Sequence, residues 1–394
     1  MTNKPRIRFR GFIEDWEQRK LGDIATFSKG NGYSKSDLAP SGEPIILYGR
    51  LYTNYETTIR NVDTFVELKD KSVISQGGEV IVPASGETAE DISRASVVKN
   101  QGIIIGGDLN VIKVNHLLDP TFLALTISNG EQQKELSKRA QGKSVVHLHN
   151  SDLQDVNLTF PLLNEQKEIS SLFEKMDSVI SLHQRKLEKI KLTKKALLQK
   201  LFPKNGSNIP ELRFKGFTDA WEQRKFKDIA FKRGEISEAD LPYVEFEDIN
   251  SGIGTLNKNI SQKVGHKKGI LFETGDVLFG KLRPYLQNWL LCQFRGIAVG
   301  DFWVLQPQNV SPAFLYYLIQ SEAYQSVANI SSGTKMPRSS WSLVSETQFS
   351  IPKYNEVNMI GEFFSSIDKN ITLHQRKLER LQEVKQGLLQ KMFV

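Results

Sequence analysis

An internal duplication constrains this chain more than any other feature. The pentapeptide Trp-Glu-Gln-Arg-Lys at residues 16–20 returns at residues 221–225, and the heptapeptide Leu-His-Gln-Arg-Lys-Leu-Glu at residues 182–188 returns at residues 373–379. Weaker matches follow between them in the same order. A period this long indicates a duplicated domain rather than a solenoid, and 394 residues are enough for two cores. Because the middles of the two copies diverge, we expect each copy to have its own target.

The middle of each copy has the pattern of a mixed α and β domain. Short β-branched runs at residues 44–48, 80–82 and 102–114 lie between Gly, Ser and Asn clusters, which predicts strands. Asp119-Pro120 and Ser311-Pro312 each combine an N-cap residue with a first-turn proline, which predicts a helix start in both copies.

Two long helices are predicted, one after each domain. From residue 165 to 201 there is no proline or glycine, and apolar residues recur in steps of three and four that are typical of a coiled-coil seam; the same stripe returns between residues 360 and 392. Each stripe could pack on its own domain, but antiparallel pairing of the two buries both stripes most economically. The expected fold is α+β: recognition domains at residues 1–161 and 204–352, with spacer helices at 162–203 and 353–394.

Composition narrows the function without fixing it. The formal net charge is +7, which suits a polyanion partner and plain solubility equally well. A single cysteine, Cys292, excludes a disulfide framework and a multi-thiolate zinc site. The first ten residues lack the apolar core of a signal peptide, and no apolar run is long enough to span a bilayer, so we expect a cytoplasmic protein.

The whole chain resembles the specificity subunit of type I restriction-modification enzymes. The resemblance rests on the duplicated openings, the twin heptapeptides, the stretch at residues 274–278 that leads to Lys-Leu-Arg-Pro at 281–284, and the pre-helix segments Phe160-Pro161 and Ile351-Pro352. It implies a non-catalytic DNA-binding subunit. Each domain would read half of a split, asymmetric site, and the helices would set the spacing and dock methylation subunits.

The resemblance also implies the partners. They are double-stranded DNA, methylation subunits, which we expect to number two, and restriction subunits that bind through them. S-adenosylmethionine, ATP and Mg²⁺ are expected on those partners, with no cofactor or metal in this chain. Our candidate surface for the methylation subunits consists of the exposed, duplicated residues off the seam: Gln184, Arg185, Lys186, Gln375, Arg376 and Lys377.

DNA contacts are expected on loops of the divergent middles, where Lys and Arg supply salt-dependent affinity and other side chains reach bases. Basic residues on such loops can equally be solvated structural features. The second copy departs from the first, because Lys281-Leu282-Arg283-Pro284 aligns with the non-basic Ala84-Ser85-Gly86-Glu87. The candidates are Tyr48, Arg50, Tyr52, Lys143 and Ser144 in the first domain and Lys281, Arg283, Tyr285, Lys335 and Arg338 in the second.

Catalytic motifs are incomplete. Asp119-Pro120 continues with Thr121 rather than the second proline of a methylase motif, and a phosphate loop at residues 142–144 would need glycine where Ser137 stands. The carboxylates of Asp63 and Glu67 could hold a nuclease metal, and His147 and His149 alternate on one strand face, but no further ligand pattern supports either. A single-chain nuclease or methylase with another site, and a helical scaffold with incidental basic loops, remain the alternatives.

Overall fold

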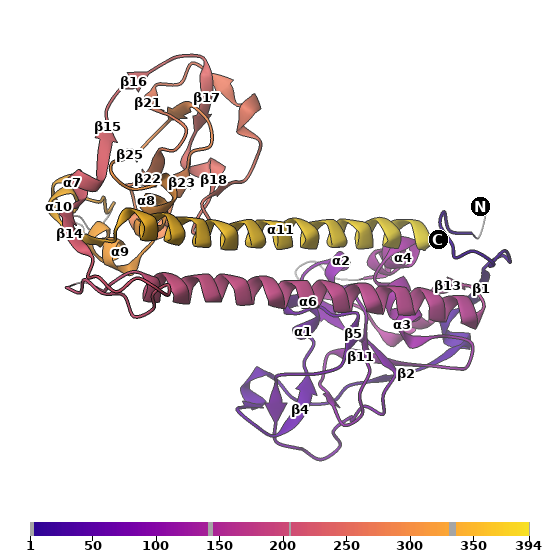
Figure 1. Ribbon diagram of the computed structural model, residues 1–394. Helices are drawn as coiled ribbons and strands as arrows, with labels where there is room; N and C mark the ends of the chain where they lie inside the picture. Colours follow the sequence, from indigo (N-terminus) through magenta and orange to yellow (C-terminus); the bar gives the residue numbers. More distant parts are fainter. Residues whose placement is uncertain (1–3, 141–144, 205, 331–335, 394) are drawn as a thin grey trace. The chain divides into compact units, whose positions relative to one another are not determined.

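The structure is a computed structural model that describes residues 4–140, 145–204, 206–330 and 336–393 (Figure 1). The chain folds into two compact units. The first unit is Met1–Gln184 with Lys377–Val394, and the second is Arg185–Arg376. Each unit therefore contains one globular domain together with part of both long helices. None of the described helices is both long enough and apolar enough to cross a membrane.

The first unit is built on two small sheets. The five-stranded sheet has the order β2 (Ala25–Lys29), β11 (Leu109–Val114), β7 (Glu79–Pro83), β9 (Ser96–Val98) and β5 (Thr58–Ile59). The four-stranded sheet has the order β10 (Ile104–Ile105), β4 (Glu43–Ile46), β6 (Phe65–Val66) and β3 (Leu38–Ala39). The predicted strands are confirmed as β4, β7, β10 and β11. The run at 102–114 divides into two strands because Asp108 adopts φ 58° after two glycines.

The second unit repeats this plan with other side chains. One sheet has the order β15 (Ala230–Arg233), β25 (Phe302–Pro307), β22 (Val277–Gly280) and β23 (Trp289–Leu291). The other has the order β16 (Ile236–Ser237), β21 (Gly269–Phe272), β24 (Gly296–Ala298), β17 (Leu241–Val244) and β20 (Val264–Gly265), and β18 (Ile249–Asn250) pairs with β19 (Thr255–Leu256). The parallel pair β17 and β24 corresponds to the parallel pair β4 and β10. The duplication predicted from the sequence is therefore a duplication of topology.

The duplicated opening forms the same strand in both units. Its Glu-Gln-Arg-Lys residues make β1 (Glu17–Lys20), which pairs with β13 (Asn157–Phe160), and β14 (Glu222–Lys225), which pairs with β26 (Gln348–Ile351). Both pairs are antiparallel and lead directly into a long helix. Trp16 and Trp221, which precede these strands, are buried in the cores of their units.

The predicted helix starts are confirmed in α3 (Pro120–Ile127) and α8 (Pro312–Leu318). The backbone N–H of Phe122 donates to Asp119 Oδ1 at 2.9 Å, and that of Phe314 donates to Ser311 Oγ at 3.2 Å. These caps satisfy donors that the first helical turn leaves open. A second helix follows in each unit, α4 (Gly130–Arg139) and α9 (Glu322–Ala328).

The long helices are α6 (Leu163–Leu201) and α11 (Tyr354–Met392), each of 39 residues. In the first unit Phe173 of α6 has its ring 6.0 Å from that of Phe393, just after α11, and in the second unit the Phe202 ring, just after α6, lies 6.3 Å from that of Phe364 of α11. Within each unit the start of one helix thus meets the end of the other, which confirms the antiparallel pairing. The predicted seam residues are all buried or half-buried: Ile169, Phe173, Met176, Ile180, Leu187, Ile190, Leu197 and Leu201 on α6, and Ile360, Phe364, Ile367, Ile371, Leu378, Leu381, Leu388 and Met392 on α11.

Two lysines interrupt the apolar stripe, and the structure explains both. Lys194 Nζ lies 2.7 Å from Asp368 Oδ1 in the second unit, and Lys385 pairs with Asp177 in the first. These are equivalent residues with the two helices exchanged. Tyr317 also donates its hydroxyl to Asp368 at 2.8 Å. Each lysine therefore links the two helices by an ion pair at a position where the stripe has no apolar residue.

A short segment before each domain is fixed to the helices in the same way. Arg8 forms a two-point ion pair with the buried Glu165 at the start of α6, at 2.6 and 2.8 Å, and Arg213 does so with the buried Glu356 at the start of α11, at 2.7 and 2.8 Å. Such planar two-point pairs fix orientation as well as distance. The pairs therefore fix the entry of the chain into both units.

Candidate nucleic-acid interface

In the second unit, a loop after β22 carries three of the predicted DNA-contacting residues. The backbone N–H of Arg283 donates to Pro337 O at 2.7 Å, and that of Ser339 donates to Lys281 O at 2.9 Å. The two segments thus run antiparallel, with Leu282 opposite Arg338. The structure brings Lys281, Arg283 and Arg338 together from positions more than fifty residues apart in the sequence.

The turn that follows Leu282 is held in a strained conformation. Arg283 and Gln287 both adopt left-handed backbone angles, with φ of 48° and 58°, on either side of the short turn Pro284–Leu286. For residues other than glycine this costs on the order of 1 kcal/mol each, and it persists only where surrounding contacts fix it. Gln287 O accepts from the Gly252 N–H at 3.0 Å. The result is a fixed turn that presents the exposed side chains of Arg283 and Tyr285.

The charge of this loop cluster is positive. Lys281 Nζ lies 3.5 Å from Asp301 Oδ1, and Arg338 Nη2 lies 3.0 Å from Asp301 Oδ2. Two cations therefore share one carboxylate, and Arg283 adds a third cation. The Arg338 side chain is 52% exposed, so it remains accessible to a ligand. Lys335, the remaining predicted residue, lies outside the described residues.

The first unit has the same backbone arrangement with different side chains. The Ala84 N–H donates to Asp108 O at 2.8 Å, as the Lys281 N–H does to Asp301 O at 2.9 Å. Strand β8 (Ser85–Gly86) pairs with β12 (Val146–His147) where the second unit has its bridge. The structure therefore supports the alignment of residues 84–87 with 281–284. The positions of all three basic residues in the second unit are non-basic or histidine in the first.

The first-domain prediction that Arg50 contacts DNA is not supported by the geometry. Its guanidinium, in α1 (Arg50–Thr53), donates to Asp63 Oδ1 and Glu56 Oε2, both at 2.8 Å, and its side chain is only 12% exposed. The hydrogen bond from Arg50 lowers the pKa of the Asp63 carboxyl. Two internal carboxylates thus neutralise this arginine, which cross-links a loop instead of remaining free for a phosphate.

The two tyrosines predicted beside Arg50 differ in accessibility. Tyr52 donates its hydroxyl to Ser85 O at 2.7 Å, and burial raises the pKa of its phenol. Tyr48 is 39% exposed, with its ring 6.2 Å from that of Tyr52. Tyr52 therefore supports strand β8, whereas Tyr48 is available at the surface. The predicted Lys143 and Ser144 lie outside the described residues.

The predicted partner surface lies on the helices. Gln184, Arg185, Lys186, Arg376 and Lys377 are exposed, and Gln375 is half-buried. The sequence analysis did not single out Leu182 and Leu373, the first residues of the twin heptapeptides, which are 58% and 63% exposed. The available signal was that an apolar residue is duplicated away from the seam. Single exposed leucines are common on protein surfaces, so it is the duplication of these two residues, and not their exposure alone, that marks them.

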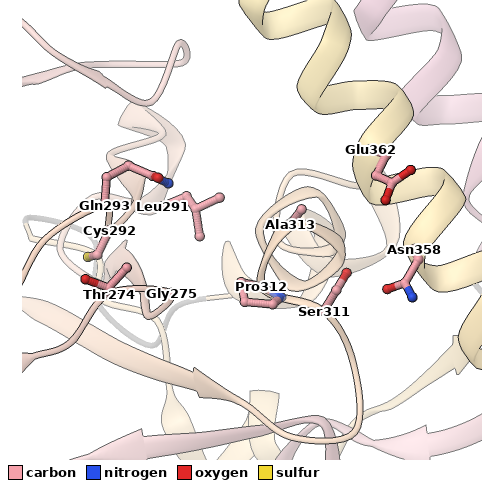
Figure 2. A pocket seen from close by; sticks show the side chains of 10 residues that line it. All are labelled: Thr274, Gly275, Leu291, Cys292, Gln293, Ser311, Pro312, Ala313, Asn358 and Glu362. Atoms are coloured by element: carbon pink, nitrogen blue, oxygen red, sulfur yellow. The ribbon is translucent and has the colours of Figure 1, made fainter.

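The structure also bears on the catalytic alternatives. A cavity of about 320 Å³ lies in the second unit. Among its lining residues, Asn358 and Glu362 project from α11 near the start of α8 (Figure 2). Cys292 is among its lining residues, but burial raises the pKa of this thiol well above its ordinary value, so it is a poor nucleophile at neutral pH. The described residues include no group of three or more side chains that could hold a metal ion. Asp63, the proposed nuclease ligand, is engaged by Arg50.

Comparison with known proteins identifies the family. The model of the type I restriction modification DNA specificity domain matches residues 13–192 and again residues 218–383. The chain belongs to this family and carries two copies of the domain.

Curated relatives and solved structures agree with this assignment. The chain is 21% identical to the type I restriction enzyme MjaVIII specificity subunit of Methanocaldococcus jannaschii, over 95% of this chain and 91% of that protein. It is 20% identical to the EcoDI specificity subunit of Escherichia coli, over 66% of each. Its fold is similar to that of the type I restriction-modification S subunit from M. genitalium, with a TM-score of 0.58, 15% identity and 99% of each chain covered. A chain from a study of complex assembly in a type I system gives a TM-score of 0.55 at 14% identity, over 98% of this chain and 99% of that one.

Proposed function

We propose that this protein is the DNA-recognition subunit of a type I restriction-modification enzyme, and that each unit binds one half of a split, asymmetric site. The observation that carries the proposal is the pair of equivalent loops. The backbone hydrogen bonds of residues 84–86 and 146–148 recur at 281–283 and 337–339, but the exposed side chains on them differ. A shared frame with unlike side chains is what two different half-sites require.

The antiparallel helices would act as the ruler between the half-sites. Each long helix has 39 residues, and one added turn lengthens a helix by about 5.4 Å, which is on the order of 1 to 2 base pairs. Four residues inserted after Lys191, with four more at the equivalent place after Gln382, should therefore change the preferred spacing of the half-sites. An unchanged spacing in a folded, assembled complex would remove the ruler role.

Catalysis would belong to partner subunits. In this proposal two methylation subunits use S-adenosylmethionine, restriction subunits bind through them and use ATP and Mg²⁺, and this chain binds none of these cofactors. The docking proposal places one contact on each long helix: the exposed Leu182 on α6, near Arg185 in the sequence, and the exposed Leu373 on α11, near Arg376. Replacing both leucines with serine should reduce co-purification with the methylation subunits. Val384→Ser, which changes an exposed apolar residue elsewhere on α11, is the matched control.

The deciding experiment is sequencing of adenine methylation in DNA from cells that express this chain with its methylation subunits. A split, asymmetric motif that depends on the chain is the expected result. Arg283→Ala with Arg338→Ala should reduce methylation of the motif, whereas Lys353→Ala, an 81% exposed lysine of the same unit, should leave methylation unchanged. An assembled complex without a new motif would favour a scaffold, and metal-dependent cutting by the isolated chain would favour a nuclease.

A further inference from the structure

We propose that His147 and His149 bind the phosphate backbone of DNA at the first half-site, with His147 in the place that Arg338 occupies in the second unit. The inference rests on the proposed function, because it assumes that the equivalent loops of both units face DNA. The sequence pattern suggested only a metal site for these two histidines.

The backbone assigns the equivalence of His147 and Arg338. His147 lies opposite Ser85 in the β8–β12 pair, as Arg338 lies opposite Leu282 in the second unit. On the next residue, the Leu148 N–H donates to Ala84 O at 3.1 Å, and the corresponding bond in the second unit, from Ser339 to Lys281, measures 2.9 Å. The two side chains therefore leave equivalent positions on equivalent strands.

The two histidines form one accessible surface. Val146 and Leu148 are buried, whereas His147 and His149 are exposed, as alternation along an extended strand requires. Their rings lie 6.4 Å apart between centroids, with an angle of 5° between the ring planes. The His147 imidazole has no hydrogen bond or ion pair with the described residues. Both rings are exposed, so a ligand can reach them.

The backbone beneath the rings is fixed. The buried Asn110 donates to Leu148 O at 2.8 Å, and Asn150 donates to Ser28 O at 3.0 Å. The His149 N–H donates to Asp152 Oδ2 at 2.8 Å, at the start of α5 (Asn150–Gln154). Strands β2, β8 and β11 and helix α5 thus hold a short stretch whose histidine side chains remain exposed. Such preorganisation reduces the entropy lost on binding.

The surrounding residues explain why histidine is needed here. Ala84 stands in the place of Lys281, and Gly86 in the place of Arg283. A Cβ at Gly86 would lie 2.8 Å from the Tyr52 hydroxyl oxygen, so this position cannot carry a side chain while Tyr52 is bound to Ser85. Of the three described positions equivalent to the basic residues of the second unit, only His147 carries a side chain that can bind a phosphate. His149 lies beside it.

The chemistry favours an anion over a metal. An imidazole N–H donates to a phosphate oxygen when neutral, and protonation adds a positive charge and a second donor. A zinc site requires at least three protein ligands. No cluster of three metal-ligating side chains occurs in the described part of the chain, so the pair alone fits a phosphate better.

The test measures DNA binding by the full complex with its methylation subunits, using a labelled duplex that carries the methylated motif and one with the first half-site scrambled. His147→Ala with His149→Ala should weaken binding by about tenfold on both duplexes, because a phosphate contact is independent of sequence. His147→Arg should bind DNA at least as tightly as the wild type. The slope of log affinity against log salt concentration should become steeper by about one, because arginine neutralises one phosphate. His147→Ala alone should leave thermal unfolding unchanged, because its ring is exposed, whereas the double variant should unfold at a slightly lower temperature, because His149 is the N-cap of α5.

Three results would overturn the inference. Full affinity in the double alanine variant, while the wild-type complex still prefers its motif, would refute the histidine contact and leave the proposed function intact. Binding that EDTA abolishes and Zn²⁺ restores would make the pair a metal site. A wild-type complex without sequence preference would refute the proposed function itself, and the inference with it. If the double alanine variant unfolds, His147→Gln with His149→Gln gives the same comparison with polar side chains retained.

Discussion

The last residues of the chain should stabilise the first domain, although they follow it by more than two hundred positions in the sequence. Phe393 is 5% exposed and belongs to the core of the first unit. Its ring lies 5.7 Å from that of Phe122 in α3 and 6.0 Å from that of Phe173 in α6. Phe393→Ala would remove an aromatic ring from this core and leave a cavity.

The expected cost can be estimated from these contacts. Replacing a buried phenylalanine with alanine costs about 3–5 kcal/mol, and the lower end applies here because the residue closes a helix that can partly adjust. For a unit of about two hundred residues, 3 kcal/mol corresponds to a fall in melting temperature of about 6–12 °C. Hydrogen exchange resolved by peptide should show the loss in α3 and in the start of α6, and protection in the second domain should stay the same.

The equivalent residue of the second unit provides the control. Phe202 is 3% exposed, and its ring lies 5.5 Å from that of Phe314 and 6.3 Å from that of Phe364. Phe202→Ala should therefore destabilise the second domain and spare the first. If Phe393→Ala increased exchange only in the last turn of α11, or equally in both domains, the assignment of the chain end to the first core would be wrong.

Three further predictions concern the role of individual charged residues in folding and binding. Arg50→Ala should lower the melting temperature of the first unit by disconnecting two carboxylates, whereas Arg283→Ala should weaken DNA binding at unchanged melting temperature; the opposite pattern would reverse their roles. Asp248 is buried, which by itself would raise its pKa, yet two lysine partners lower it, so its stabilisation should be lost as pH falls below the ordinary carboxyl range. Subtracting the acid-unfolding curve of Asp248→Asn from that of the wild type should isolate this loss. Lys194→Met should cost roughly 1–3 kcal/mol because it leaves Asp368 without its cation, and Asp368→Asn in the same chain should recover part of it, which chemical denaturation can measure.

The sequence predicted the helices and strands of this protein because the patterns that indicate them are local or periodic. The caps at Asp119 and Ser311, the heptad-like stripe and the strand runs depend on neighbouring residues, and each forms as predicted. The lysines at 194 and 385 were visible only as gaps in the stripe. Their aspartate partners lie on the other helix, so no local pattern could connect them.

The candidate interface was harder to predict because charge alone does not reveal a residue's partner. Arg50 and Arg338 look alike as basic residues near turns, but Arg50 meets two carboxylates inside its own domain, whereas Arg338 shares one carboxylate with Lys281. His147 looked like half of a metal site until the strand pairing placed it opposite Ser85. Long-range pairing, which sequence spacing does not encode, decided each case.

The contacts that the two copies share differ in how much change they tolerate. The ion pairs Arg8 with Glu165 and Arg213 with Glu356 bury a carboxylate that is 1% exposed in each case. Losing one partner would leave a buried charge unpaired at a cost of about 3–5 kcal/mol, so both residues must be kept together. At the exposed loop positions, by contrast, arginine can become histidine while the backbone hydrogen bonds stay the same, because those bonds involve no side chain. The side chains at these exposed loop positions can therefore diverge between the two units while the fold of each unit stays the same.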